Sequence, residues 1–193
     1  MRIARLVFSA ALLAGTACAG ILTYDANLTG TAEVPPNASP GTGFATVIFD
    51  TTANTMEVDV TFSDLLGTTT ASHIHCCTAT PDSGNAGVAT TTPTFTLFPL
   101  GVTSGTYDLI FDLTLASSYN PAFVTAQGSV ANAEAALLAG VADGEAYLNI
   151  HTTVVPGGEI RGFLQPAPAT TPEPGTFALA GVALLGLALR RRR

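Results

Sequence analysis

Three histidines are the side chains in this sequence best suited to bind a metal ion. His73 and His75 are two residues apart, a spacing that places both imidazoles on one face of an extended strand. His151 lies in a second strand-like segment, on the face that also carries Tyr147 and Asn149. A His-x-His pair with a third histidine from another strand can chelate zinc or copper. The alternative is that the three rings hydrogen-bond across strands and to loop backbone.

Two adjacent cysteines, Cys76 and Cys77, directly follow the first pair. Neighbouring cysteines cannot link distant parts of a fold, so an oxidising compartment leaves a disulfide between the two or pairing with another chain. A mixed site with His75 is a further alternative. The acidic run at 82–85 suggests Ca²⁺ binding but lacks the full EF-hand pattern.

The single basic residue between positions 20 and 171 is Arg161. The same stretch contains thirteen acidic residues, so its net charge is −12. A surface of this sign repels phosphate backbones and excludes nucleic acid as a partner. A buried arginine requires a carboxylate partner, and we expect a structural ion pair between Arg161 and Glu159, with Asp64 or another carboxylate as the alternative.

No set of catalytic residues can be assigned. The sequence contains neither a Ser-His-Asp signature nor a glycine-rich phosphate loop. Its carboxylates are scattered through strand-like segments, so no glycosidase pair stands out. We therefore expect a protein that is not an enzyme and that requires no cofactor, zinc or copper at the histidines being the exception.

The elements that must position these side chains are mostly strands. Apolar residues alternate with polar ones at Met56, Val58, Val60 and Phe62, which is typical of a half-buried strand. Low Lys and Glu content with abundant Thr and Val favours strands throughout the central stretch. The pattern predicts an all-β sandwich of eight strands, at 22–28, 44–49, 56–62, 72–76, 94–98, 106–115, 145–152 and 159–164.

One segment favours a helix instead. Residues 129–139 are good helix formers with apolar residues at helical spacing, and Gly140 or Gly144 would end the helix. We expect one short helix at an end or edge of the sandwich. The domain is predicted to span residues 20–165, and a stiff Pro-rich linker follows at 166–175.

The two ends of the chain differ in kind from this domain. Residues 1–19 combine an Arg-containing start, a short apolar run and a small-residue pattern, which predicts a secretory signal peptide cut after Ala19. Residues 176–193 combine an apolar helix with a terminal arginine cluster, which predicts one membrane pass with the arginines on the cytoplasmic side.

The C-terminal segment resembles the PEP-CTERM sorting signal of exopolysaccharide-producing Gram-negative bacteria. The matching residues are Pro172, Glu173 and Pro174, then the apolar helix, then Arg190, Arg191, Arg192 and Arg193. The resemblance implies passage through the Sec export machinery, a transient stay in the inner membrane, and cleavage by an exosortase. The protein would then be released or placed at the cell surface, with an exopolysaccharide as a possible partner.

The central domain resembles the CHRD domain, first named from chordin. The resemblance rests on three separated motifs: the start at 28–36, the Ser72-His73-Ile74-His75 strand, and the ending at 147–162. It implies an immunoglobulin-like, Greek-key β-sandwich. The histidine pattern is similar to part of the ligand set of copper/zinc superoxide dismutase. We expect a non-catalytic structural or binding module in an exopolysaccharide matrix, with a metal-binding or redox protein as the alternative.

Overall fold

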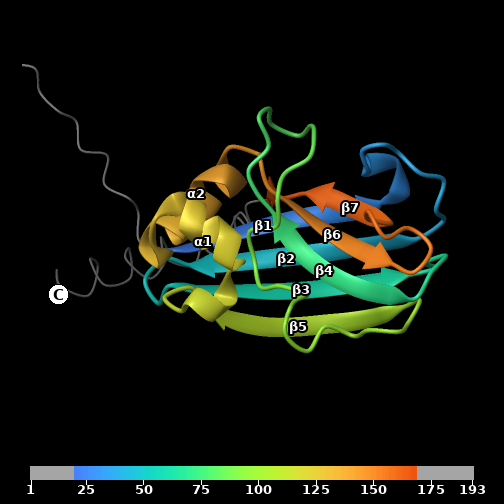
Figure 1. The fold of residues 1–193 in the computed structure, drawn as a ribbon, viewed down its shortest axis with the longest axis horizontal. Helices are drawn as coiled ribbons and strands as arrows, with labels where there is room; N and C mark the ends of the chain where they lie inside the picture. Colours follow the sequence, from blue (N-terminus) through green and yellow to red (C-terminus); the bar gives the residue numbers. More distant parts are fainter. Residues whose placement is uncertain (1–19, 169–193) are drawn as a thin grey trace, which may run out of the picture.

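The computed structural model describes residues 20–168, and they form an antiparallel sheet with helices at one end (Figure 1). The predicted signal peptide, the residues of the sorting motif and the predicted membrane helix lie outside the described residues. No helix within residues 20–168 is long and apolar enough to cross a membrane.

Eight strands make up the sheet, in the order β4-β6-β7-β1-β2-β3-β5, with β8 paired to β1. Their bounds are β1 Ile21–Thr29, β2 Thr42–Asp50, β3 Thr55–Ser63, β4 Thr69–His75, β5 Gly105–Asp112, β6 Tyr147–Thr152, β7 Ile160–Phe163 and β8 Gln165–Pro166. All-β architecture is therefore confirmed, and seven of the eight expected strands are present with shifted ends.

The core lies inside the curl of this sheet. Met56, Val58 and Val60 of β3 are fully buried, as their alternation predicts. On β6, Leu148 and Ile150 point into the same core, so the residues between them must face the opposite side. The core-facing pattern of β4 and β6 thus fixes which side carries the histidines.

The strands form one continuous, curled sheet whose two halves face each other as the two layers of the expected sandwich would. The reason is β7, which pairs with β6 on one side and with β1 on the other. The sheet bends at this junction, and β4 and β6 come to lie over β1, β2 and β3 (Figure 1). The two halves then bury a common core, as two sheets of a sandwich would.

The strand expected at 94–98 was wrong, and this segment is irregular. It lies in the long loop at 76–104 between β4 and β5, where Pro93 and Pro99 cannot donate to a ladder. Phe95 and Phe98 are nevertheless buried, and their rings lie 5.9 and 5.3 Å from that of Tyr107. The apolar residues of this segment are therefore buried, but they anchor a loop to the core and do not form a strand.

Two α-helices are present where we expected one. The expected helix is α2, Val130–Ala142, capped by Ser129, whose side chain accepts a hydrogen bond from the Asn132 N–H. The additional helix is α1, Pro121–Gln127, with Asn120 as its N-cap. Short 3-10 turns, η1 at Gly30–Ala32 and η2 at Ala116–Ser118, complete the elements.

The sulfurs of Cys76 and Cys77 are bonded to each other, and this disulfide packs directly against helix α2. A side chain at Gly140 would overlap both sulfurs. Of the alternatives open from the sequence, the structure thus contains the disulfide between neighbours. The absence of a side chain at Gly140 is what lets α2 approach.

We predict that G140A destabilises the domain by about 1–3 kcal/mol, because the added methyl group must push α2 away from the disulfide. In a helix without such a contact the same change stabilises by roughly 1 kcal/mol. The sign of the change in the free energy of unfolding therefore shows whether the contact with the disulfide is present. Urea unfolding measures the difference. G157A is the matched control, since a Cβ there meets no atom within 4 Å. A G140A protein as stable as wild type would contradict this packing.

Candidate metal centre

The three histidines come together because β4 and β6 are hydrogen-bonded neighbours. His73 is paired with Asn149, and His151 with Ala71, so all three rings project from the side of the sheet opposite the core. The ring centroids are 5.2 Å apart for His73 and His151, and 5.8 Å apart for each of the other two pairs. The prediction that His73 and His75 lie on one face of a strand is confirmed, and His151 joins them on that side of the sheet.

Each ring uses one nitrogen to contact a backbone carbonyl. Nε2 of His73 lies 2.6 Å from the Pro93 oxygen, Nδ1 of His75 lies 2.9 Å from the Ala86 oxygen, and Nδ1 of His151 lies 2.9 Å from the Pro156 oxygen. A carbonyl oxygen can only accept, so the contacting nitrogen must carry the hydrogen in every case. In the neutral ring, the other nitrogen then presents a lone pair.

The remaining nitrogens converge. Nδ1 of His73 and Nε2 of His75 and of His151 are buried without a hydrogen-bond partner among the described residues. The three rings offer one ligand atom each within 4.8 Å of one another. Three lone pairs facing one another with no donor between them fit a cation, and the carbonyls behind the rings are the outer partners that metal-binding histidines usually have.

Burial lowers the pKa of all three imidazoles, and for His75 it does so to about 4. The hydrogen bonds to the carbonyls act in the opposite direction but do not outweigh burial. Without a metal the three rings are therefore neutral near pH 7, which is the protonation state that a metal ion requires of its ligands.

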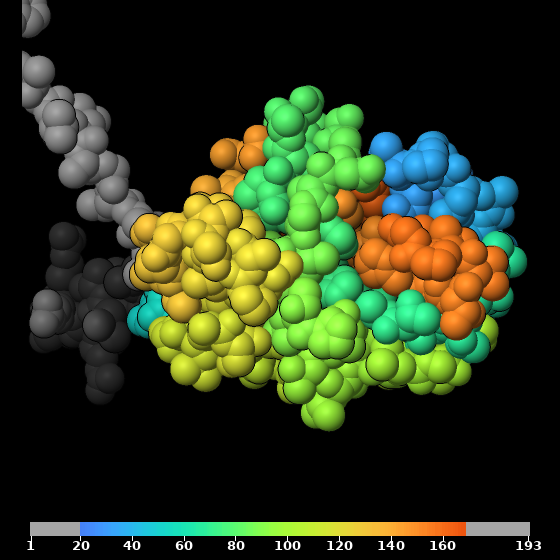
Figure 2. All heavy atoms as spheres, in the orientation of Figure 1, coloured from blue at the N-terminus to red at the C-terminus, as the bar shows by residue number. Residues whose placement is uncertain are grey.

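Two connecting segments cover this face. The loop at 76–104 supplies the Ala86 and Pro93 carbonyls, and the turn between β6 and β7 supplies that of Pro156. In Figure 2 the green loop runs across the face, between the yellow helices and the orange turn. His73 and His75 are buried and His151 is partly exposed, but the unpaired nitrogen of each ring is itself buried.

Arg161 adjoins the centre through a stack of side chains. Its guanidinium carbon lies 4.5 Å from the ring centroid of Tyr147, and that ring stacks on His75 at 4.8 Å. The Arg161 side chain is almost fully buried, and it donates to the Ala32 carbonyl at 2.6 Å and to Asn85 at 2.8 Å.

The expected ion pair between Arg161 and Glu159 was wrong. The carboxylate near Arg161 is that of Glu33, with 3.9 Å between Nε and Oε2, because η1 turns the chain over β7. The alternative partner Asp64 instead contacts Ser63. A partner from so distant a part of the chain leaves no local signal in the sequence.

Glu159 is fully buried and accepts hydrogen bonds from Ser39, Thr152 and the N–H groups of Leu66 and Gly67. Burial alone raises the pKa of this carboxyl group, but these hydrogen bonds outweigh it and lower the pKa. Since Thr152 directly follows His151, this carboxylate holds the end of β6 that presents the third ligand.

Glu33 behaves differently, because it has fewer donors. Oε2 accepts a 3.4 Å hydrogen bond from Asn149, whereas Oε1 is buried without a partner among residues 20–168. Burial raises the pKa of Glu33 to about 7, against the opposing effects of Arg161 and Asn149. Asn149 Oδ1 also lacks a partner, so the unpaired buried side-chain atoms of the described chain all belong to this face.

The other residues considered from the sequence lie outside the cluster. The two cysteine sulfurs face the Ala136 carbonyl of α2, so they add no ligand. In the acidic run at 82–85, Asp82 accepts from Gln165 and Asn85 accepts from Arg161. These oxygens thus serve contacts within the protein.

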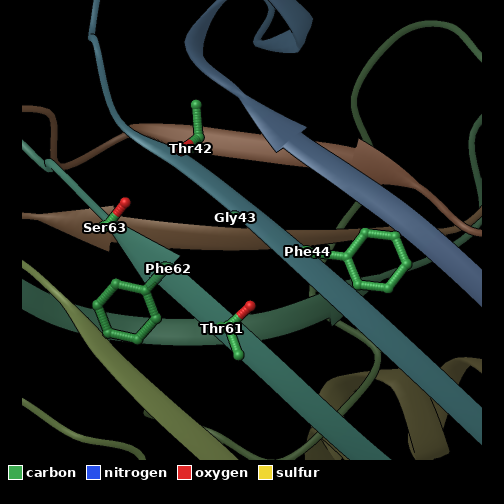
Figure 3. Close-up of a pocket in the computed structure, with 6 residues that line it drawn as sticks. All are labelled: Thr42, Gly43, Phe44, Thr61, Phe62 and Ser63. Atoms are coloured by element: carbon green, nitrogen blue, oxygen red, sulfur yellow. The ribbon is translucent and has the colours of Figure 1, made fainter.

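A cavity of about 330 Å³ lies elsewhere, over β2 and β3 (Figure 3). It is lined by Thr42, Gly43, Phe44, Thr61, Phe62 and Ser63. None of these side chains ionises near neutral pH or ligates metals readily, so the histidine cluster remains the candidate centre.

Sequence reasoning missed Glu33 and the three carbonyls. No sequence pattern marks Glu33 as a neighbour of Arg161. Backbone carbonyls are present at every residue, so no pattern marks them either. The position of Tyr147 and Asn149 could be predicted, because they alternate with Leu148 and Ile150 and therefore lie on the same face as His151.

Two family models match the chain. One, described as CHRD domain, matches residues 24–164, and the other, described as PEP-CTERM protein-sorting motif, matches residues 170–193. No curated protein and no solved structure matches.

We predict a pH-dependent stability difference between wild type and E33Q. Because the pKa of Glu33 is raised from 4.5 to about 7 on folding, its stabilising contribution is complete below pH 4.5 and is lost as the pH rises through 7. Relative to E33Q, the wild type should lose about 1–3 kcal/mol between pH 4.5 and 7.5. Urea unfolding with a chelator present measures this.

The histidines titrate alike in both proteins, so their contribution cancels in the difference. A flat difference between E33Q and wild type over this pH range would contradict the raised pKa.

Proposed function

The chain belongs to the CHRD domain family, whose model spans all three histidines, and from this premise we propose that it is an exported module that binds one metal ion. The ligands are His73, His75 and His151. The observation that carries the proposal is the convergence of three buried ring nitrogens, each with its lone pair turned inward by a carbonyl behind the ring. Hydrogen bonding across strands, the alternative reading of these histidines, would pair those nitrogens.

A metal here would act as a link between the sheet and its loops. Two ligands come from β4 and one from β6, and the ring N–H groups reach carbonyls in the loop at 76–104 and in the β6–β7 turn. One ion would therefore stabilise the irregular cover of this face. Such use of a metal suits an exported domain that must persist outside the cell.

A binding role is favoured over an enzymatic one. The ligand nitrogens are enclosed, whereas catalytic metal sites keep a position open for water or substrate. The buried carboxylates, Glu33 and Glu159, face Arg161 and a set of hydroxyl and backbone donors respectively. Neither is aimed at an open cleft as a general base would be.

The sorting motif at 170–193 makes the chain an exosortase-sorted, exported protein. Beyond this, we place the domain at the cell surface or in an exopolysaccharide matrix, after Sec export and a transient stay in the inner membrane. Its lone basic side chain between 20 and 171 is buried, so the exposed surface attracts cations and repels anionic polymers and nucleic acid.

We predict that the purified protein binds one metal ion per chain and that H73A, H75A and H151A each abolish stoichiometric binding. Loss of an outer partner alone costs 10–100-fold in affinity, so loss of a ligand should exceed about 100-fold. Elemental analysis after chelation, metal loading and desalting measures the stoichiometry. D82N, which alters the acidic run, should bind as wild type does. Unchanged binding in H73A and H151A would refute the centre.

We predict further that the mature protein ends near Pro174, because an exosortase cuts close to the Pro-Glu-Pro motif. Mass spectrometry of the natural protein's C-terminus tests this. Replacing Pro172, Glu173 and Pro174 together with alanine should leave Arg193 in place. Recovery of wild type with Arg193 intact at the cell surface would contradict processing.

A further inference from the structure

The number of donors in the centre limits which metal it can hold. Among residues 20–168 the cluster offers three imidazole nitrogens. Cys76 and Cys77 are bonded to each other and face α2, and the Glu33 carboxylate is directed at Arg161 and Asn149. Zinc in proteins is almost always four-coordinate, with a fourth protein ligand or a water molecule. Glu33 Oε1 and Asn149 Oδ1 are buried oxygens without a partner on this face, but no other histidine, cysteine or acidic side chain of residues 20–168 joins the three nitrogens, which are themselves buried.

Charge limits the choice further. The three ligands are neutral, so the full charge of the ion remains in a buried site. The nearest cation is Arg161, which lies over Tyr147, and Tyr147 in turn stacks on His75. The Born cost of burying an ion grows with the square of its charge, so a monovalent ion incurs about a quarter of the cost of a divalent one. The positive charge of Arg161 increases this difference.

We propose that the ion held by His73, His75 and His151 is copper(I), bound by three imidazoles without a fourth ligand. Imidazole is a good ligand for copper, and copper(I), with half the charge of zinc(II), depends less on a fourth ligand. The assignment rests on the proposed metal-binding function and adds to it the identity and oxidation state of the ion. It accounts together for the donor count, the neutral ligands and the nearby arginine.

The test compares copper(I) with zinc(II) on the exported, naturally processed protein. Copper(I) is supplied anaerobically with ascorbate and competed against bicinchoninate, and zinc(II) is competed against a zinc indicator. We expect one copper(I) per chain, held on the order of 100-fold more tightly than zinc(II). The X-ray absorption spectrum of the copper form should show a three-coordinate copper(I) edge with nitrogen neighbours only.

Two variants sharpen the result. H151Q should lose copper(I) to bicinchoninate, whereas D82N should retain it. An unfolded variant would also lose the metal, so circular dichroism of each apo-protein is recorded to show that it is folded. If H151Q fails to fold, H73Q replaces it.

The outcomes separate the two claims. Zinc bound as tightly as copper(I), or a fourth ligand in the copper spectrum, overturns the copper(I) assignment and leaves the metal-binding function standing. Failure to bind either metal overturns both. Copper(I) retention by folded H151Q overturns the assignment to these three ligands.

Discussion

Hydrogen bonds from the three histidine rings to loop carbonyls connect the irregular segments to the sheet and set the orientation of the rings. A carbonyl can only accept, so each contact decides which ring nitrogen carries the hydrogen and turns the other lone pair inward. Pro93, Ala86 and Pro156 belong to irregular segments, so the centre requires these segments to be in place. Loop and sheet are thus coupled through the three rings, and a metal ion would strengthen a connection already present.

Around the centre, the charges are arranged so that no cation is exposed on the domain. The domain's single arginine is buried between Tyr147 and the 3-10 turn before Glu33, and it donates mostly to neutral oxygens. The carboxylate of Glu33 has a raised pKa because burial outweighs the attraction of Arg161. The acidic side chains that remain exposed give the domain its strongly negative surface, which suits an exported protein that must stay soluble.

Local patterns predicted the elements well wherever one face of a strand is buried. Alternation located β3, β4 and β6, and it placed His73 and His75 on one face of β4 and His151 on the same face of β6 as Tyr147 and Asn149. It failed at 94–98, where Phe95 and Phe98 are buried from a loop rather than from a strand. The first helix had a readable signal, since Asn120 and Pro121 begin it and Gly128 ends it in the left-handed region. The partner of Arg161 had no such signal.

Composition, period-two alternation and short motifs are local properties of the chain, and they were enough to predict the all-β class, the sorting motif, the negative charge of the domain and the candidate ligands. The folded structure was needed to show that the sheet is one curled layer, that Glu33 rather than Glu159 lies beside Arg161, and that three carbonyls orient the three imidazoles. Each of these depends on contacts between segments far apart in the chain. Backbone carbonyls are the same at every residue, so no sequence pattern can show which of them will face a histidine.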